Sequence, residues 1–235
     1  IRMRNTSNDS ESKTSLTITP FTIPQAKNRA EIPYGQSTYV LYYSPISNRG
    51  IEVIPNFSDK LDAESLSEKN KCRIASNGGF YTTDSTPLGL FKINNTVIGS
   101  EKKETNLING FFYLDDSGNP HIDRAYPNNA PTVIQTGPFF SAGNTVSTTN
   151  DKPARRVVII EAISGEYYIA AVTTKETTTS GPFLSDLPVI LFSITEPFEV
   201  LRALNLDGGA ASFYKDESGF TLSELTHVGS VICVK

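Results

Sequence analysis

The sequence predicts an α+β fold of mixed, mostly antiparallel β-sheets with few helices. Three observations support this class. Apolar runs of strand length recur along the chain, Gly, Asn, Asp and Ser clusters separate most of them, and only two stretches show helical spacing. We find no internal repeat of fixed period in the sequence.

Length and charge limit the classes of protein that the chain can belong to. It has 235 residues and a formal net charge of -4, so a partner that needs clustered cations, such as nucleic acid, is not expected. No apolar run approaches the roughly 20 residues that a transmembrane helix needs. We expect a flexible polar tail over residues 1–20, rich in Ser, Thr and Asn, and a single domain over residues 21–235.

The first elements come early in this domain. Alternating apolar residues predict a strand over 39–43, and a second strand over 51–54 is expected as its hairpin partner across Asn48-Arg49-Gly50. Ser58 and Asp59 offer an N-cap, which predicts a short surface helix over 59–70.

Short strands are then expected to alternate with turns. They span 71–75, 88–93, 96–98, 111–114, 121–122, 132–135, 157–162, 167–173, 200–206 and 230–234. A second helix is expected over 182–194, where apolar residues recur at helical spacing. Pro188 lies inside that stretch and predicts a kink or a broken start.

The chain has two cysteines, Cys72 and Cys233. One long-range disulfide in an oxidising compartment and two buried thiols are equally compatible with the sequence. Only two histidines occur, too few for a His-rich metal site.

Two similar motifs carry most of the functional signal. Asn77-Gly78-Gly79 and Asn205-Leu206-Asp207-Gly208-Gly209 each follow a short apolar run. Paired glycines let the backbone approach a ligand closely, and successive N–H groups can form an anion-binding nest. Asn-Gly and Asp-Gly are also strong hairpin signals, so each motif taken alone is equally well a simple turn.

Two further segments add polar groups. Arg155 stands at the mouth of a predicted strand, where its guanidinium could clamp a phosphate or carboxylate, although an arginine at a strand edge is often only a surface residue. Gln135 ends another predicted strand just before the Gly137-Pro138 turn.

Taken in order, these motifs resemble those of the phosphodiester glycosidase family. The resemblance extends roughly over residues 71–235 and rests on five segments: Ala75 to Tyr81, Pro87 to Leu90, Gln135 to Pro138, Ala154-Arg155, and Ala203 to Gly209. It implies a secreted or cell-envelope hydrolase, active outside the cytoplasm, that releases a sugar such as N-acetylglucosamine from a sugar-phosphodiester or a related glycoconjugate.

The resemblance also implies the site. The expected catalytic residues are Asp207, Asn77 and Arg155. The expected substrate-binding residues are Gly78, Gly79, Gln135, Gly137, Asn205, Gly208, Gly209 and Ser212. No cofactor is expected, and a divalent cation beside Asp207 is left open.

Cleavage of a glycosyl phosphate builds positive charge on the sugar and negative charge on the phosphate. We therefore expect Arg155 and the glycine amides at the phosphate and Asp207 at the anomeric carbon. Asp84 and Glu161 are the candidates for a second carboxylate.

The sequence also departs from the family pattern. Ala210 and Ala211 follow the second glycine pair, where the family usually has a small residue or Pro and then Ser. Arg156 follows Arg155, where the family often has Thr. A carbohydrate-binding or cell-envelope module that kept the fold without the chemistry is therefore the alternative, and an assembly protein of the envelope is a third hypothesis.

Overall fold

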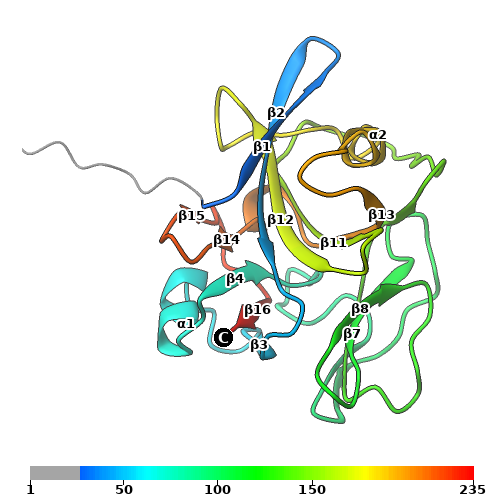
Figure 1. The fold of residues 1–235 in the computed structure, drawn as a ribbon. Helices are drawn as coiled ribbons and strands as arrows, with labels where there is room; N and C mark the ends of the chain where they lie inside the picture. Colours follow the sequence, from blue (N-terminus) through cyan, green and yellow to red (C-terminus); the bar gives the residue numbers. More distant parts are fainter. Residues whose placement is uncertain (1–26) are drawn as a thin grey trace, which may run out of the picture.

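The computed structural model describes residues 27–235, which form three antiparallel sheets and two short helices. The expected tail over residues 1–20 lies outside this range. Figure 1 shows the first sheet running through the upper part of the molecule, with the second and third sheets below it.

The first sheet has the strand order β1-β2-β12-β11-β13-β10. Its strands span β1 Arg29–Tyr34, β2 Ser37–Pro45, β12 Tyr167–Thr174, β11 Arg156–Ala162, β13 Val200–Asn205 and β10 Phe139–Ser141. β11 is buried on both faces, since Val157 and Ile159 pack into one hydrophobic cluster while Val158 and Ile160 pack into another. A strand covered on both sides reads as a continuous apolar run, as residues 157–160 do.

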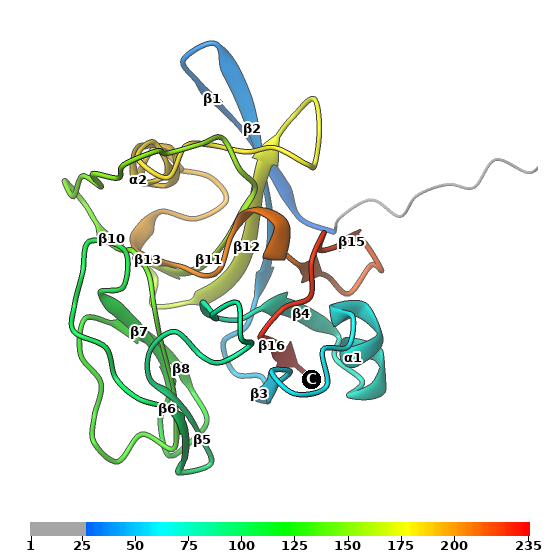
Figure 2. The same cartoon turned by 180° about the vertical axis from the view of Figure 1, so that it is seen from behind.

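The second sheet has the order β15-β14-β4-β16-β3. Its strands span β15 Thr221–Leu222, β14 Tyr214–Lys215, β4 Ile74–Asn77, β16 Ser230–Val234 and β3 Ile51–Pro55. The third sheet has the order β6-β5-β9-β7-β8 and forms the lower lobe seen from behind in Figure 2. Its strands span β6 Thr96–Gly99, β5 Phe91–Ile93, β9 Thr132–Thr136, β7 Gly110–Leu114 and β8 Pro120–Asp123.

The helices cover the outer faces of the first two sheets. α1, Ala63–Lys69, packs Leu66 against the second sheet, and α2, Leu187–Phe192, packs Leu187, Ile190 and Leu191 on the first. Burying each of these α2 side chains stabilises the fold by about 1.5–3 kcal/mol. Within residues 27–235 no helix is long and apolar enough to cross a membrane.

Both helices are shorter than expected. α1 begins after Asp62, whose carboxylate accepts a hydrogen bond from the Ser65 N–H at 2.7 Å, and not after Ser58 or Asp59. α2 begins after Asp186, so Pro188 lies in its first turn. A proline is tolerated there because that N–H has no partner within the helix. Of the two alternatives expected for Pro188, a kink or a broken start, the structure shows the late start.

The predicted hairpin between residues 39–43 and 51–54 is wrong. β2 pairs instead with β1 and β12, while β3 pairs with the C-terminal strand β16 in another sheet. The tight turn lies earlier, at Gly35, whose φ of +59° suits glycine. The short strands β1, β10, β14 and β15 were not predicted, and β4 is displaced toward Asn77.

The fold is therefore β-rich, and its few helices fit the α+β class only loosely. Every strand pair in the described residues is antiparallel, so the expected mixed character is not seen there.

Cys72 and Cys233 form a disulfide, which decides between the two alternatives left by the sequence. Their Cα atoms are 5.2 Å apart, and the bond ties the segment after α1 to β16 across 161 positions.

We predict that replacing both cysteines by alanine lowers the free energy of unfolding by about 2–5 kcal/mol, because the unfolded chain regains the entropy of a long loop. Guanidinium chloride titrations with and without reductant measure this. Reductant should shift the midpoint of the original protein and leave that of the double variant unchanged. Equal midpoints for the original protein in both conditions would contradict the prediction.

Candidate active site

The two glycine motifs meet in space although they are 130 residues apart. β4 from the second sheet ends at Asn77, and β13 from the first sheet ends at Asn205. The Asp207 N–H donates to the Gly78 carbonyl at 3.1 Å. Neither motif is therefore a simple hairpin turn, and their junction joins two sheets.

Asn77 holds this junction together. Its side-chain amide donates to the carbonyls of Gly78 at 3.0 Å and Asp207 at 2.7 Å, and its Oδ1 accepts from the Phe213 N–H at 3.0 Å. The side chain is 1% exposed. Its observed contacts make Asn77 a positioning residue for both turns.

Gly78 is required by close packing. A Cβ at this position would lie 2.2 Å from Ser230 Oγ on β16, which is closer than any real contact. The second motif turns at Gly209, whose φ is +64°.

Three of the four glycine amides that were expected to face an anion donate within the protein. The N–H groups of Gly78, Gly208 and Gly209 donate to Ser230 O, Asp207 Oδ1 and Arg155 O, respectively. Because these three donors already have partners inside the protein, the positive charge for an anion has to come from elsewhere.

Arg155 is buried beneath the second motif. Its Nε donates to the Gly209 carbonyl at 2.9 Å and its Nη2 to the Ala210 carbonyl at 3.4 Å, and the residue is 2% exposed. Desolvation by burial lowers the pKa of Arg155, and the charge of Glu224 partly offsets that effect. Arg155 thus stabilises the turn at Gly209 through these hydrogen bonds and does not line the cavity described next.

Other predicted substrate-binding residues also bond within the protein. Gln135 Oε1 accepts from the Leu90 and Lys102 N–H groups, at 3.0 and 2.8 Å, and anchors the loop that follows β6. Ser212 Oγ donates to the Arg155 carbonyl at 3.1 Å.

Asn205 and Gly137 form a third buried link. Asn205 Nδ2 donates to the carbonyls of Gly137 at 2.9 Å and Leu206 at 2.6 Å. Asn205 Oδ1 is buried and has no hydrogen-bond partner. This link fixes the start of β10 against the end of β13.

Asp207 lies at a cavity of about 330 Å³. Asp207, Gly208 and Gly209 of the second glycine motif line it, together with Phe80, which follows the first motif. The other lining residues come from the loops before β7, before β11 and before α2 and from the first residue of β11: Leu107, Thr148, Thr149, Asn150, Asp151, Lys152, Ala154, Leu184 and Arg156. Burial raises the pKa of Asp207 to about 7, against the lowering effect of a hydrogen bond from the Gly208 N–H. A carboxyl group with this pKa exchanges a proton near neutral pH.

Arg156 supplies the positive charge in this cavity. Its Nη1 lies 3.3 Å from where a Cβ of Gly208 would stand, so glycine leaves room for the guanidinium. The side chain donates to the carbonyls of Pro182 and Lys152, and its Nη2 lies 3.6 Å from Asp151 Oδ1. Burial lowers the pKa of Arg156, and the charge of Asp151 opposes that shift.

Asp151 is the second carboxylate of the cavity, which the sequence did not reveal. Burial would raise its pKa, but hydrogen bonds from the N–H groups of Ser185 and Leu184, together with Arg156, hold it below the usual value. The two candidates expected for this role lie elsewhere: Glu161 pairs with Arg202, and Asp84 is exposed on a turn. The surroundings of the two carboxyl groups thus raise the pKa of Asp207 and lower that of Asp151, a pattern typical of acid–base sites.

Within residues 27–235, no cluster of three or more His, Cys, Asp or Glu side chains could hold a metal ion.

Known proteins resemble this chain in structure but do not match it in sequence. No protein-family profile and no curated protein sequence matches it. The catalytic domain of zebrafish N-acetylglucosamine-1-phosphodiester α-N-acetylglucosaminidase, auto-inhibited by its pro-peptide, superposes with a TM-score of 0.66 at 14% identity, covering 88% of this chain and 81% of that one.

Two other solved structures are similar as well. A hypothetical protein from Synechocystis gives a TM-score of 0.58 at 14% identity over 88% of this chain and 61% of that one. A Burkholderia pseudomallei protein described as exported gives 0.55 at 9% identity over 86% and 75%. At these identities the likeness supports the fold that the sequence motifs implied.

We predict that Asn77→Ala destabilises the protein by about 2–4 kcal/mol, because it removes three hydrogen bonds and leaves buried carbonyl and N–H groups without partners. Chemical denaturation measures the loss. Asn129→Ala, which removes an exposed amide bonded to Asp116, is the matched control and should change stability by less than about 0.5 kcal/mol. Equal effects of the two substitutions would count against the role of Asn77.

Asp207 should make stability depend on pH in a defined direction. Its pKa is about 7 in the folded chain and ordinarily 3.8, so between these values the folded chain holds a proton that the unfolded chain has lost. Raising the pH through this window therefore lowers stability. The Asp207→Asn variant has no carboxyl group to ionise, so it does not lose this stability as the pH rises. We predict that its Tm exceeds that of the original protein at pH 8, by about 2–4 °C for each kcal/mol of unfolding free energy gained.

This difference should shrink toward pH 4, where the carboxyl group is protonated in the folded chain. Thermal unfolding from pH 4 to pH 8 measures it. A difference that does not change with pH would contradict the raised pKa.

Proposed function

We propose that this protein is a hydrolase that cleaves the bond between the anomeric carbon of a sugar and the phosphate of a phosphodiester, in the cavity at Asp207. One observation carries the proposal: Asp207 and Arg156 line the same cavity, beside the junction of the two glycine motifs, which belong to the five segments that carry the family resemblance. The fold likeness to a phosphodiester glycosidase supports it.

The chemistry needs one cation and one base. Asp151 and two carbonyls hold the Arg156 guanidinium through Nε and Nη2, and in this proposal Nη1 donates to the phosphate oxygens. Lys152 lines the same cavity and adds a second positive charge. Negative charge builds up on the phosphate as the bond breaks. The two cations therefore stabilise the transition state more than the bound substrate.

Asp207 acts as the general base in this proposal. Its ionised carboxylate takes a proton from water, the water oxygen bonds to the anomeric carbon, and the bond from that carbon to the phosphate oxygen breaks with its electron pair. The leaving group is the phosphate monoester of the acceptor, which is a stable anion, so no separate proton donor is needed. A raised pKa makes the carboxylate a stronger base than an ordinary aspartate.

The disulfide and the exported structural neighbour support a place outside the cytoplasm, in the secreted or envelope fraction.

A binding-only role is the second candidate, favoured by the internal bonds of Arg155, Gln135 and Ser212, which leave the cavity fewer polar groups than the motifs suggested. A module of this kind would bind the sugar-phosphodiester without releasing sugar.

We predict that the protein releases sugar from an aryl phosphodiester of α-N-acetylglucosamine, and that Asp207→Asn lowers kcat about 10²–10⁴-fold, the usual contribution of a general base. In the original protein kcat/KM should rise with pH through a midpoint near 7, as Asp207 loses its proton. Sugar release measured from pH 5 to pH 9 tests both statements.

Asp59→Asn, the same substitution at an exposed position beyond β3, is the control and should keep full activity. Binding of the diester without release by the original protein would select the binding module. Equal turnover by the Asp207→Asn variant would rule out the mechanism.

The role of Arg156 can be separated from that of Arg155. We predict that Arg156→Gln raises KM for the diester and lowers kcat/KM by about tenfold or more, because a charged hydrogen bond to the phosphate contributes about 1.5–3 kcal/mol. Arg155→Gln should mainly lower stability, since its donors hold the Gly209 and Ala210 carbonyls. Kinetics and denaturation of both variants measure the split, and the reverse pattern would assign the phosphate to Arg155.

A further inference from the structure

The strand β3 leaves one edge of the second sheet open. It is the last strand of that sheet, and among residues 27–235 no strand pairs with its outer edge. Figures 1 and 2 show β3 on the side of the second sheet that faces the third sheet. An open edge is a row of backbone N–H and C=O groups with which another extended chain can pair.

The register of β3 against β16 identifies the open groups. Where this pair begins, the Lys235 N–H donates to the Gly50 carbonyl at 2.9 Å. Bonded and non-bonded residues alternate along an antiparallel pair, so the even-numbered residues of β3 bond to β16. The N–H and C=O groups of Ile51 and Val53 therefore point to the open edge, and Pro55 adds a carbonyl there.

A groove of about 430 Å³ runs along this edge, and we call it the β3 groove. All five residues of β3 line it, although adjacent side chains of a strand point to opposite faces, so the groove follows the edge of the sheet. Its other wall is one end of the third sheet: the end of β5, the turn between β7 and β8, and the start of β9.

The β3 groove has room for a short stretch of added strand. Strand residues rise by about 3.3 Å, paired strands lie about 4.8 Å apart, and stacked sheets lie about 10 Å apart. Each added residue therefore needs roughly 160 Å³, and the groove holds about three residues.

The charge of the β3 groove is negative. Glu52, Asp115 and Asp116 line it, and within the described part of the chain no Lys, Arg or His does. Hydrogen bonds from the Asn119 side chain and from N–H groups of the turn lower the pKa of Asp115 to about 2, so this carboxylate is ionised at neutral pH. Lys235 pairs with Glu52 at 2.9 Å from outside the groove and offsets one of the three charges.

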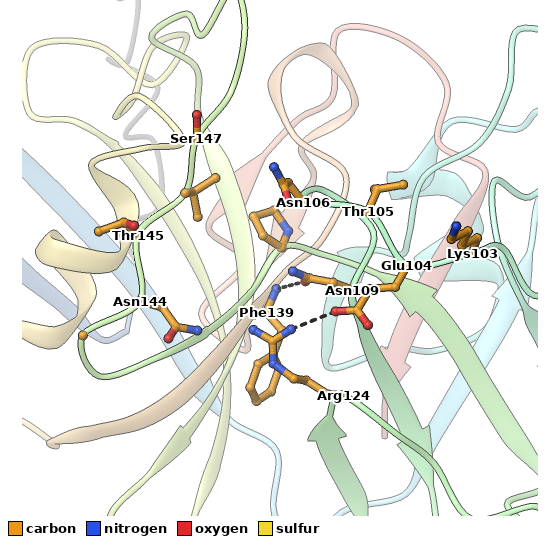
Figure 3. Close-up of a pocket in the computed structure, with 13 residues that line it drawn as sticks. Lys103, Glu104, Thr105, Asn106, Asn109, Arg124, Phe139, Asn144, Thr145 and Ser147 are labelled. Atoms are coloured by element: carbon orange, nitrogen blue, oxygen red, sulfur yellow. Dashed lines mark hydrogen bonds and ion pairs between the residues drawn. The ribbon is translucent and has the colours of Figure 1, made fainter.

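Other cavities carry cations. The largest, of about 800 Å³, has Lys103 and Arg124 against one carboxylate, Glu104 (Figure 3). The cavity at Asp207 also contains cations. The β3 groove has the opposite charge, so it suits a cationic ligand.

The two faces of β3 define the side chains that an added strand needs. Ile51 and Val53 pack into a hydrophobic cluster that Leu114 of the groove wall shares, whereas Glu52 is exposed on the other face. Residues directly opposite each other on paired strands lie on the same face. An added strand therefore places apolar side chains beside Ile51 and Val53 and basic side chains beside Glu52.

We infer that the β3 groove binds an extended segment of another protein, in which basic and apolar β-branched residues alternate, as an additional strand of the second sheet. Backbone hydrogen bonds at Ile51 and Val53 supply affinity, and the carboxylates select positive charge. A second copy of this chain is disfavoured, because β3 paired with itself brings a second Glu52 to the same acidic groove. The inference is independent of the proposed function.

The first test compares peptides by fluorescence anisotropy. The probe is a labelled peptide of three Lys-Val repeats, and two further versions carry N-methyl groups on every Lys or on every Val. In an added strand one of these two sets of N–H groups faces β3 and the other faces away. We expect one methylated version to bind about tenfold more weakly than the other, since it loses its hydrogen bonds to β3.

The second test measures amide hydrogen exchange with and without the unmethylated peptide. Saturating peptide should slow exchange of the Val53 N–H about fivefold or more, because this group gains a partner. The Glu52 N–H already bonds to β16 and should keep its rate.

The third test addresses charge. We expect the double variant Glu52→Gln, Asp116→Asn to bind the peptide about threefold to tenfold more weakly, as loss of exposed ion pairs does. Asp59→Asn with Glu176→Gln, the same change of charge at exposed positions outside the groove, is the matched control and should keep the affinity.

Equal binding of the two methylated peptides, an unchanged exchange rate at Val53, or full affinity of the groove variant would each overturn the inference. Sedimentation of the protein alone should show a monomer. A dimer whose formation protects the Val53 N–H would assign the edge to a second copy and also contradict the inference.

Discussion

Asn77 makes three hydrogen bonds that no water can replace, because its side chain is enclosed between two sheets. The bond to the Asp207 carbonyl joins the end of β4 to the segment that follows β13, and the bonds to Gly78 and Phe213 fix the Asn77 side chain that makes it. A buried amide with all these bonds formed specifies one arrangement, whereas losing any of them leaves an unpaired polar group at a cost of about 1–3 kcal/mol. The site therefore depends on the junction that Asn77 makes between the two sheets.

The electrostatics of the site follow from that junction. Enclosure raises the pKa of Asp207, while backbone N–H donors and Arg156 keep the pKa of Asp151 low. One cavity therefore holds a carboxyl group that can exchange a proton near neutral pH and a carboxylate that stays ionised and holds a cation. Asp207 and Asp151 are the same type of residue, so their different pKa values and roles come from burial and hydrogen bonding.

The sequence predicted most strands, because these depend on local patterns, and the order of the motifs pointed to the two glycine motifs and to Asp207 as site residues. It could not predict whether Arg155 or Arg156 faces the cavity. Adjacent side chains of a strand point to opposite sides, but this alternation does not identify the side on which the cavity lies. Asp151 lies in a loop without a motif, and the pairing of β3 with β16 depends on contacts distant in sequence. The amides of Gly78 and Gly208 were expected to face a ligand, but they bond within the protein.

The most direct measurement is the pKa of Asp207 itself, followed by the carboxyl ¹³C chemical shift in protein labelled at aspartate. The signal is assigned by its absence from the Asp207→Asn variant. An inflection near pH 7 is expected if the two turns enclose the carboxyl group as described. An inflection near the ordinary value of 3.8 would show that the group is solvated and that the turns do not form this site.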